Sequence, residues 1–309
     1  MSAKTGIEWT DATWNPVVGC RKVSDGCKNC YAKTLHDLRH KAYHEGKRMP
    51  EQYAVPFETV QLMHERIDTP LHWKKPRRIF VNSVSDLFHE DVPDAFIDEV
   101  MAVVRLAHWH TFQVLTKRPA RMFAWYERWA NEYPGFDGRL PENLWLGVSV
   151  EHQAAADERL PFLLEIPNVR RFVSCEPLLG PVNLRAAIDR ENRLIYDGLD
   201  SMRTEYNQAG HTFPEAYTKL HWVIAGGESG KHARPMHADW ARSLRDQCQA
   251  TSTPFFFKQW GEWCQNYQFQ VSRCMAKEIW RWLDGSISMR VGVQASGHLL
   301  DSKAWRQVP

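Results

Sequence analysis

The sequence predicts a parallel (β/α) partial barrel of the TIM type, and three observations lead to this class. Short apolar runs alternate with longer segments of helical periodicity along most of the 309 residues. The runs are apolar on both faces, which is typical of strands covered on both sides. Polar residues directly follow the runs, at the carboxyl ends where such folds carry their functional groups. Because parallel strands need crossover connections, the alternation favours one parallel sheet.

The individual elements follow from this pattern. A strand is predicted before the first cysteines, and six more lie at 78–83, 111–116, 144–150, 171–175, 222–226 and 254–258. Helices are predicted at 94–106, 119–131, 153–164 and 239–250, where apolar residues recur at helical spacing. Seven strands favour a barrel or partial barrel over an open doubly wound sheet.

The predicted barrel occupies residues 1–262 and carries two insertions, near 33–75 and 178–220, where the alternation breaks. Residues 263–309 contain several glycines that interrupt the pattern. We expect this extension to pack on the barrel as a small cap.

Composition excludes several classes of protein. The chain is 43% hydrophobic and 25% charged, with a net charge of +2, as in an ordinary globular protein. No run approaches the ~20 apolar residues that span a bilayer, and the N-terminus has no apolar signal-peptide core. We therefore expect a cytoplasmic protein with no membrane partner. Seven cysteines, an odd number in a long chain, argue against a disulfide framework.

Two short basic clusters lie at 74–78 and 117–121, and the chain has 14 tryptophans. Aromatic side chains beside basic residues can stack on bases along a phosphate-binding groove. DNA or RNA is therefore a candidate partner. The alternative is that the clusters are solvated surface and the tryptophans belong to the core.

Three cysteines, Cys20, Cys27 and Cys30, fall within eleven positions. Clustered thiolates are ligands of zinc or of iron–sulfur clusters. A closed zinc site needs a fourth ligand, for which His36 and His40 are the candidates. A four-iron cluster held by three cysteines instead leaves one iron open for a small molecule.

Residues around the cysteines fit a bulky group. Gly19 and Gly26 directly precede two of them and would let the backbone approach the group closely. Tyr31 is placed to shield or polarise it. The scattered Cys175, Cys248, Cys264 and Cys274 are expected to be buried small hydrophobes.

The run Asn15-Pro16-x-x-Gly19-Cys20, followed by Cys27-x-x-Cys30-Tyr31-Ala32, resembles the radical S-adenosylmethionine (SAM) enzymes of the spore photoproduct lyase-like branch. Six residues separate the first two cysteines here, whereas the common pattern has three. Later segments are similar in the same order: 83–88, 116–117 and 174–177. Over most of its length the chain also resembles a phage-associated family of unknown function with a three-Cys motif.

This resemblance implies a radical SAM-like barrel with a [4Fe-4S] cluster on the three cysteines and SAM as second cofactor. It implies an enzyme of the lyase or oxidoreductase kind, an electron donor of the flavodoxin or ferredoxin type, and a nucleic acid or a phage-encoded protein as candidate partners. Lys117 and Glu176 are the expected catalytic residues. The expected cofactor-binding residues are Ser85, Asp86, Lys117, Ser149, Glu151, Glu176, Gly226, Gly227 and Glu228.

The last three of these residues form a Gly-Gly-Glu run. It is similar to the amino-group-binding motif of the superfamily but follows a late strand, so it is interpreted as a lining element. Two other functions stay open: a non-catalytic zinc or cluster protein that recognises DNA or a partner protein, and a barrel enzyme with a purely structural cysteine site.

Overall fold

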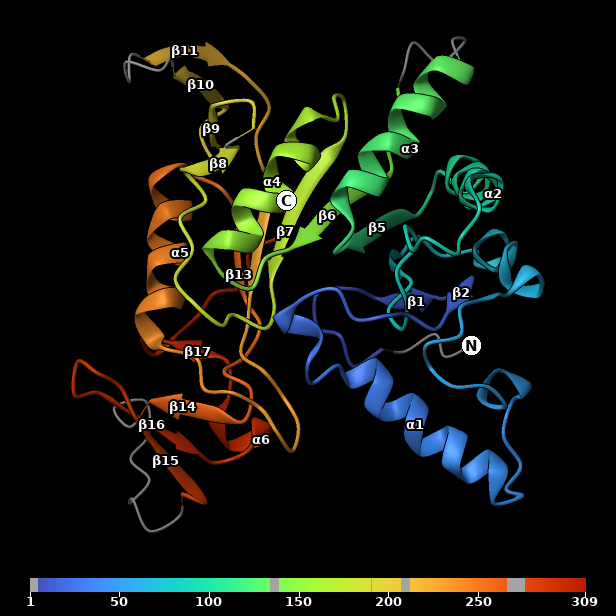
Figure 1. Cartoon of the computed structure of the whole chain (residues 1–309), viewed down its shortest axis with the longest axis horizontal. Helices are drawn as coiled ribbons and strands as arrows, with labels where there is room; N and C mark the ends of the chain where they lie inside the picture. Colours follow the sequence, from blue (N-terminus) through green and yellow to red (C-terminus); the bar gives the residue numbers. More distant parts are fainter. Residues whose placement is uncertain (1–4, 134–138, 190, 207–211, 266–275) are drawn as a thin grey trace. The chain divides into compact units, whose positions relative to one another are not determined.

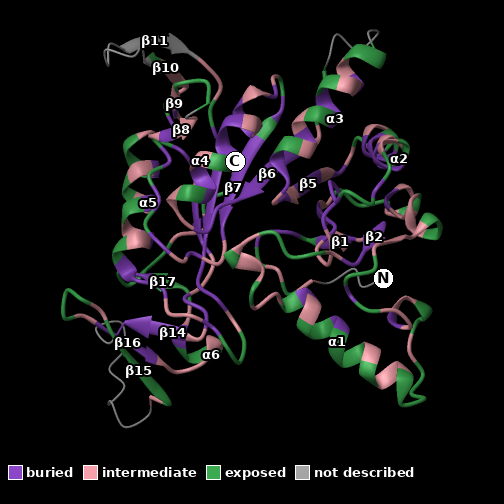
Figure 2. Cartoon of the chain, in the orientation of Figure 1, coloured by how far each residue is buried: buried purple, intermediate pink, exposed green. Residues whose placement is uncertain are grey.

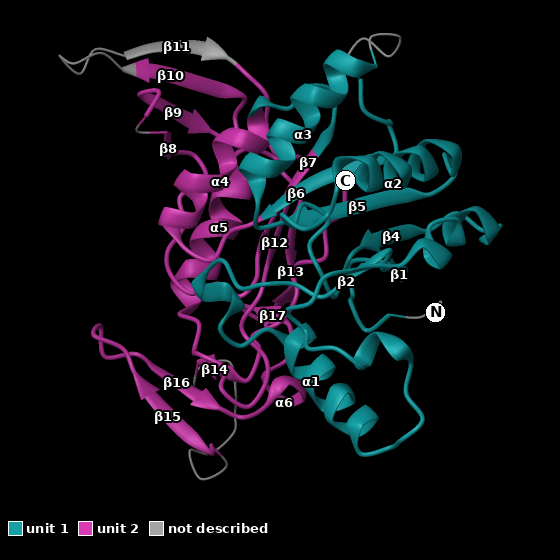
Figure 3. Ribbon diagram, turned by 45° about the vertical axis from the view of Figure 1, so that its right-hand side comes forward, with its two compact units in different colours: residues 1–148, 165–170 teal, residues 149–164, 171–309 magenta. Residues whose placement is uncertain are grey.

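The computed structural model describes residues 5–133, 139–189, 191–206, 212–265 and 276–309. The chain divides into two compact units (Figure 3), of which the first holds residues 1–148 and 165–170 and the second holds 149–164 and 171–309. No helix in the described ranges has the length and apolar character needed to cross a membrane.

Unit 1 is built on four strands that lie in the order β1-β4-β5-β6. They are β1 (Ala12–Trp14), β4 (Arg78–Val81), β5 (Thr111–Thr116) and β6 (Leu144–Ser149). All of their pairings are parallel. Two helices, α2 (Asp94–Leu106) and α3 (Pro119–Glu132), make the crossovers from β4 to β5 and from β5 to β6 (Figure 1).

The apolar side chains of these strands form the core of unit 1. Trp14, Val81, Val114 and Leu146 stand at one level of the sheet and are all fully buried. Burying each such side chain contributes about 1.5–3 kcal/mol. Figure 2 shows the buried strands and the exposed outer side of the long helix α1 (Tyr31–His44). The strands are therefore apolar because the structure buries both of their faces, as the sequence predicts.

The segment 33–75 consists mainly of α1, three short 3₁₀ helices and one two-residue strand. The short helices are η2 (Glu51–Tyr53), η3 (His64–Arg66) and η4 (Thr69–His72). The strand β3 (Gln61–Leu62) pairs antiparallel with β2 (Val17–Val18). Directly after β2 comes the segment 19–30, which carries the three cysteines and is called the cysteine loop below. This insertion thus returns to support the segment that carries Cys20.

Unit 2 holds three parallel strands in the order β7-β12-β13, namely β7 (Arg170–Cys175), β12 (Trp222–Ala225) and β13 (Phe255–Phe257). Helix α5 (Ala238–Ala250) connects the last two, and α4 (Gln153–Glu165) precedes the first. Within 178–220 an antiparallel sheet has the order β11-β10-β9-β8, from β8 (Ala187–Asp189), β9 (Leu194–Asp197), β10 (Met202–Tyr206) and β11 (Thr212–Ala216).

The remaining elements of unit 2 are small. An antiparallel sheet has the order β14-β16-β15, and a two-stranded ladder follows it. These elements are β14 (Trp263–Gln265), β15 (Glu278–Arg281), β16 (Ile287–Arg290), α6 (Val293–Ser296), β17 (Leu299–Leu300) and β18 (Lys303–Ala304).

The predicted fold class, a parallel partial (β/α) barrel, is confirmed: the main sheet has seven strands, four described above in unit 1 and three in unit 2. The predicted strand 111–116 and helix 94–106 match β5 and α2 residue for residue. The predicted strand 78–83 ends earlier, because Asn82 adopts a left-handed φ of 60° directly after β4. The domain boundary at residue 262 stays a prediction, and the compact units divide the chain elsewhere.

Candidate metal centre

The three cysteines lie on the segment between β2 and α1, at the carboxyl end of the unit 1 strands. Cys27 ends the 3₁₀ helix η1 (Asp25–Cys27), and Cys30 stands at the N-cap of α1. All three are half-buried free thiols. Because Cys30 precedes a helix of 14 residues, the positive end of the helix dipole lies next to it. The loop therefore offers three half-buried sulfur donors, of which Cys30 lies where the helix dipole favours negative charge.

Gly19 fixes where the loop leaves the sheet. Its φ is +88°, and a Cβ there would lie 2.3 Å from the backbone oxygen of Thr59. The backbone N–H of Cys20 donates to the carbonyl of Phe57 at 3.0 Å. The glycine is thus required by close approach to the insertion 33–75. Gly26, the second glycine of the motif, lies in η1, where no positive φ is found.

Asp86 lies on the segment after β4, beside the cysteine loop, and its buried carboxylate accepts four hydrogen bonds. Its Oδ1 accepts from the backbone of Phe88 at 3.0 Å and from Oγ1 of Thr116 at 2.7 Å. Its Oδ2 accepts from the backbone N–H of Lys117 at 3.1 Å and from Nη1 of Arg118 at 3.2 Å. The candidates Asp86 and Lys117 therefore meet through the main chain of Lys117.

Arg118 connects this carboxylate to the cysteine loop. Its Nη1 also donates to Sγ of Cys20 at 3.7 Å, and its Nε donates to Oε1 of Glu90 at 2.9 Å. A second ion pair, Arg21–Asp91 at 2.5 Å, joins the loop to the same β4–α2 segment. The ion pair Arg21–Asp91 and the hydrogen bonds of Arg118 to Cys20 and to the carbonyl of Arg21 thus connect the cysteine loop to the ends of β4 and β5.

Two further groups of unit 1 frame the loop. Ser85 donates its hydroxyl to the carbonyl of Val17 at 2.7 Å, and a parallel bridge joins Ser85 to Gly19. Tyr31 is 57% exposed and donates to the carbonyl of Ser83. Ser85 thus lies beside the start of the cysteine loop, and Tyr31 connects the start of α1 to the end of β4.

Burial raises the pKa of the Cys20 thiol to about 11, and Asp86 adds to the rise while the positive charge and hydrogen bond of Arg118 oppose it. Burial likewise raises the pKa of Cys248 and of Cys264 to about 12 and that of Cys175 well above its usual value. These three thiols are fully buried, which confirms the prediction of small core hydrophobes. Cys274 lies outside the described residues.

The pKa of Cys20 predicts its reactivity in the metal-free protein. Alkylation needs the thiolate, so a rise from 9.0 to about 11 lowers the rate at pH 8 by about a hundredfold. We expect the rate in the native protein to keep rising about tenfold per unit from pH 8 to 10. Peptide mass spectrometry after iodoacetamide pulses measures it, with the same residue in urea as the control. A rate that levels off near pH 9 in the native protein would contradict the prediction.

The donor set fits a cluster better than a single zinc ion. Tetrahedral Zn–S bonds of ~2.3 Å bring sulfurs to roughly 3.8 Å from one another. Of the described His, Cys, Asp and Glu residues, no three that include a cysteine have their ligand atoms within 4.8 Å of one another. His36 and His40 bind the backbone oxygens of Val55 and Tyr53 at 2.9 and 2.7 Å. Wider spacing suits a cluster, because each thiolate binds a different iron.

In unit 2 the predicted residues gather after β7 and β12. Glu176 pairs with Nζ of Lys258 at 3.1 Å and accepts from the hydroxyl of Ser174 at 3.3 Å. A Cβ on Gly226 would lie 2.7 Å from Oε1 of Glu176. Gly226 therefore leaves room for the catalytic candidate Glu176, and the structure brings these two predicted residues together.

The other unit 2 candidates are held by internal contacts. Glu228 accepts from Nε and Nη2 of Arg234 at 2.9 and 2.6 Å. A Cβ on Gly227 would lie 1.9 Å from the carbonyl oxygen of Trp260, so close backbone packing requires this glycine. Glu151 is fully buried and accepts from Nη1 of Arg159 at 2.9 Å.

Ser149 is also buried, and its carbonyl accepts from the same arginine at 2.8 Å. A cofactor-binding role for any of these residues stays a prediction.

The two basic clusters differ in position. The cluster 74–78 lies just before β4, at the end of that strand opposite to Asp86. In the cluster 117–121, Arg118 is buried on Asp86 and Glu90, and Arg121 is paired with Asp94. Two of the charges expected to contact phosphate are therefore engaged inside unit 1.

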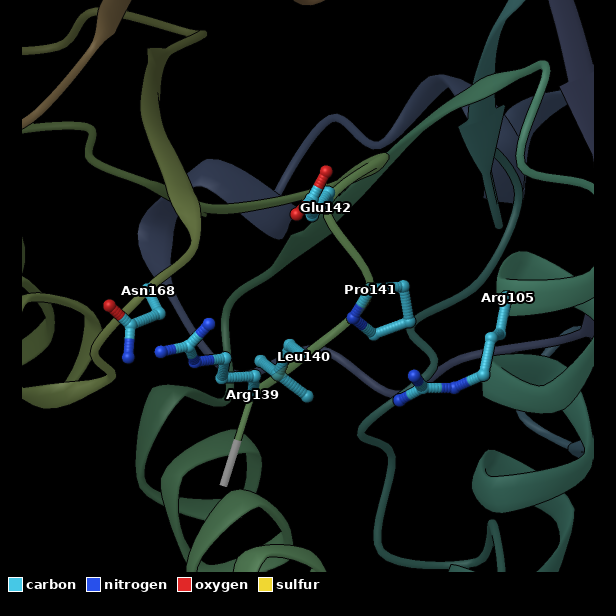
Figure 4. A pocket seen from close by; sticks show the side chains of 6 residues that line it. All are labelled: Arg105, Arg139, Leu140, Pro141, Glu142 and Asn168. Carbon is cyan, nitrogen blue, oxygen red and sulfur yellow. The ribbon is translucent and has the colours of Figure 1, made fainter. Parts of the chain in front are cut away.

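A cavity of about 650 Å³ in unit 1 lies apart from the predicted site (Figure 4). Its lining comes from the end of α2 and from the segments before β6 and β7, which are the amino ends of strands. It contains none of the predicted site residues. The lining residues are Arg105, Arg139, Leu140, Pro141, Glu142 and Asn168.

The sequence assigns no site role to three residues of these arrangements: Glu90, Arg118 and Lys258. Arg118 and Lys258 directly follow apolar strand runs, which is the signal that marks the predicted site residues, and Arg118 also lies in the basic cluster 117–121. Glu90 has no comparable signal, because it does not directly follow a strand and lies four residues after Asp86.

Comparison with known proteins gives a family and a distant structure. No curated protein matches the sequence. The solved structure of a spore photoproduct lyase mutant, in which a serine replaces a cysteine, aligns with a TM-score of 0.40 and 9% sequence identity, covering 94% of this chain and 71% of that one. A family model described as "Protein of unknown function (DUF5131)" matches residues 4–309. The chain therefore belongs to the DUF5131 family.

Proposed function

We propose that this protein is a radical SAM-type enzyme that binds a [4Fe-4S] cluster through Cys20, Cys27 and Cys30. The observation that carries the proposal is the arrangement of three free, half-buried thiols on one loop at the carboxyl end of the strands. Such a cluster, when bound, supplies the electron that splits SAM into methionine and an adenosyl fragment that takes hydrogen from the substrate.

The chain's own residues give this loop a defined frame. The ion pair Arg21–Asp91 and the hydrogen bonds of Arg118 to Cys20 and Arg21 contact it from one side. The close approach of Gly19 to Thr59 holds it from the other. A frame of this kind keeps three sulfur donors in place before the cluster binds, which lowers the entropy lost on binding.

The remaining site roles in the proposal follow the ends of the strands. In unit 1, Lys117 provides a cation for the SAM carboxylate, while Ser85 offers a hydroxyl beside the loop. Asp86 acts indirectly, because two of its four hydrogen bonds orient Lys117 and Arg118. In unit 2, Glu176 is the candidate acid or base, and it pairs with Nζ of Lys258 at 3.1 Å.

Nucleic acid is the substrate class that we propose, with a small acidic redox protein as electron donor. The exposed Lys74 and Lys75 lie beside Trp73, which Arg77 covers at 4.9 Å from the ring centroid. This arrangement suits contact with phosphate and a base. Its place at the amino end of β4 means that it would hold the nucleic acid away from the reacting nucleotide.

One experiment tests the proposal. The protein, purified and reconstituted without oxygen, is expected to contain about four irons per chain. After reduction with dithionite it is expected to release 5′-deoxyadenosine from SAM, and addition of DNA or RNA oligonucleotides is expected to increase the yield. A colourless protein with one zinc per chain would exclude the proposal. A brown protein inert towards SAM would favour a non-catalytic cluster protein.

A further inference from the structure

Arg118 is buried against the cysteine loop, and its guanidinium has no role in the binding of SAM as proposed for this site. Nη1 lies 3.7 Å from Sγ of Cys20 and 3.2 Å from Oδ2 of Asp86. Nε donates to Glu90 at 2.9 Å, and Nη2 donates to the carbonyl of Arg21 at 3.2 Å. Since all three nitrogens are engaged, this group is held in place by the protein and is not free to bind a substrate anion.

We propose that Arg118 is a positioning residue that orients Cys20 and sets the reduction potential of the cluster that this cysteine ligates. The inference rests on the proposed function, because it requires a cluster on Cys20. It adds to that function the way in which the protein adjusts how readily the cluster is reduced.

The physical reason is the charge of the reduced cluster. Reduction adds one negative charge, which spreads over the irons, the sulfides and the ligand sulfurs. A donor N–H on a ligand sulfur and a nearby positive charge both stabilise that added charge, so they raise the reduction potential. Only 6% of the Arg118 side chain is exposed, so solvent and salt screen its charge weakly.

The neighbouring carboxylates lower the reduction potential, whereas Arg118 raises it. The sign of the shift on removing each group can therefore be tested. Asp86 and Glu90 both contact the guanidinium, and each would disfavour added negative charge nearby. Glu90 has a side chain that is 60% exposed, so it can be neutralised without burying a new polar group. Removing Arg118 and removing the charge of Glu90 should therefore shift the potential in opposite directions.

The backbone at Arg118 is held in place at the end of β5. The backbone N–H of Arg118 donates to Oγ1 of Thr116 at 2.9 Å, and Pro119 begins α3 directly after it. The chain direction is thus fixed where β5 ends. Lysine would keep the charge at this position but lose the planar fork that reaches Cys20, Asp86 and Glu90 together.

The experiment is a dithionite titration of the reconstituted full-length protein without SAM, with the reduced cluster followed by electron paramagnetic resonance. Arg118→Gln is expected to move the midpoint potential to a more negative value and Glu90→Gln to a more positive one. Arg118→Lys is expected to lie between the wild type and Arg118→Gln. The matched control is Arg121→Gln, three residues along on α3, because Arg121 is paired with Asp94 and is expected to leave the potential unchanged.

The outcomes separate the inference from the proposed function. A wild-type protein that assembles no iron–sulfur cluster removes the proposed function. A wild-type cluster whose potential is unchanged, or more positive, in Arg118→Gln overturns the inference alone. Shifts of the same sign in Arg118→Gln and Glu90→Gln would indicate a loosened loop and also overturn it. If Arg118→Gln does not fold, the signs for Arg118→Lys and Glu90→Gln decide the question.

Discussion

Replacing Cys27 with alanine is expected to reduce bound iron from about four atoms per chain to less than one and to abolish 5′-deoxyadenosine formation. The reason is that each thiolate of a three-cysteine site holds one iron, so loss of one ligand opens the cluster to loss of iron. Iron analysis and the absorbance of the reconstituted protein measure the first effect. Chromatography of the SAM products measures the second.

The matched control is Cys248→Ala. Cys248 is fully buried on α5 in unit 2 and lies outside the cysteine loop. This variant should keep its iron and its SAM cleavage, with a modest loss of stability from the lost thiol packing. Loss of the cluster in Cys248→Ala and its retention in Cys27→Ala would show that the ligand assignment is wrong.

Replacing Asp86 with asparagine is expected to lower the free energy of unfolding of the metal-free protein by about 3–5 kcal/mol. Asp86 is the buried anion opposite the buried Arg118, and its two oxygens accept from four donors. Asparagine removes the negative charge and directs an NH₂ group at donors that need an acceptor. Urea unfolding followed by tryptophan fluorescence measures the change.

Asp91→Asn provides the control for that measurement. Asp91 pairs with Arg21 on the surface, where the side chains are 42% and 54% exposed. An exposed pair contributes about 0–1 kcal/mol, so this variant should unfold at nearly the same urea concentration as the wild type. Equal losses in both variants would mean that Asp86 is not the stabilising centre of the loop.

The sequence was sufficient for the main strands and helices and for the class of the fold because these depend on local patterns. Whether a run such as Thr111–Thr116 forms a buried strand depends on the apolar character of consecutive residues, which β5 confirms. Helix α2 begins at Asp94 because Pro93 sets the preceding backbone and apolar residues then recur at helical spacing. Strand ends were less predictable, since the left-handed Asn82 has no distinct local signature.

The candidate site residues of unit 1 follow from the same kind of local pattern. Ser85, Asp86 and Lys117 were selected because they follow strands, and parallel strands place their carboxyl ends at one edge. The structure shows that Asp86 meets the backbone of Lys117 and the side chain of Arg118. The sequence did not indicate which of these neighbours Asp86 would meet through the main chain and which through the side chain.

By itself the sequence determined the parallel α/β class, the order of strands and helices, and the three-cysteine motif on which the proposed function rests. Only the tertiary structure decided how that motif is supported. Arg118 and Cys20 lie 98 positions apart in the sequence, yet their side chains share a hydrogen bond. Residue 19 must be glycine because a Cβ there would clash with the backbone of Thr59. The periodicity of a sequence depends on residues that are near one another in the chain. Contacts of this kind form between segments that are distant in the sequence, so no local pattern predicts them.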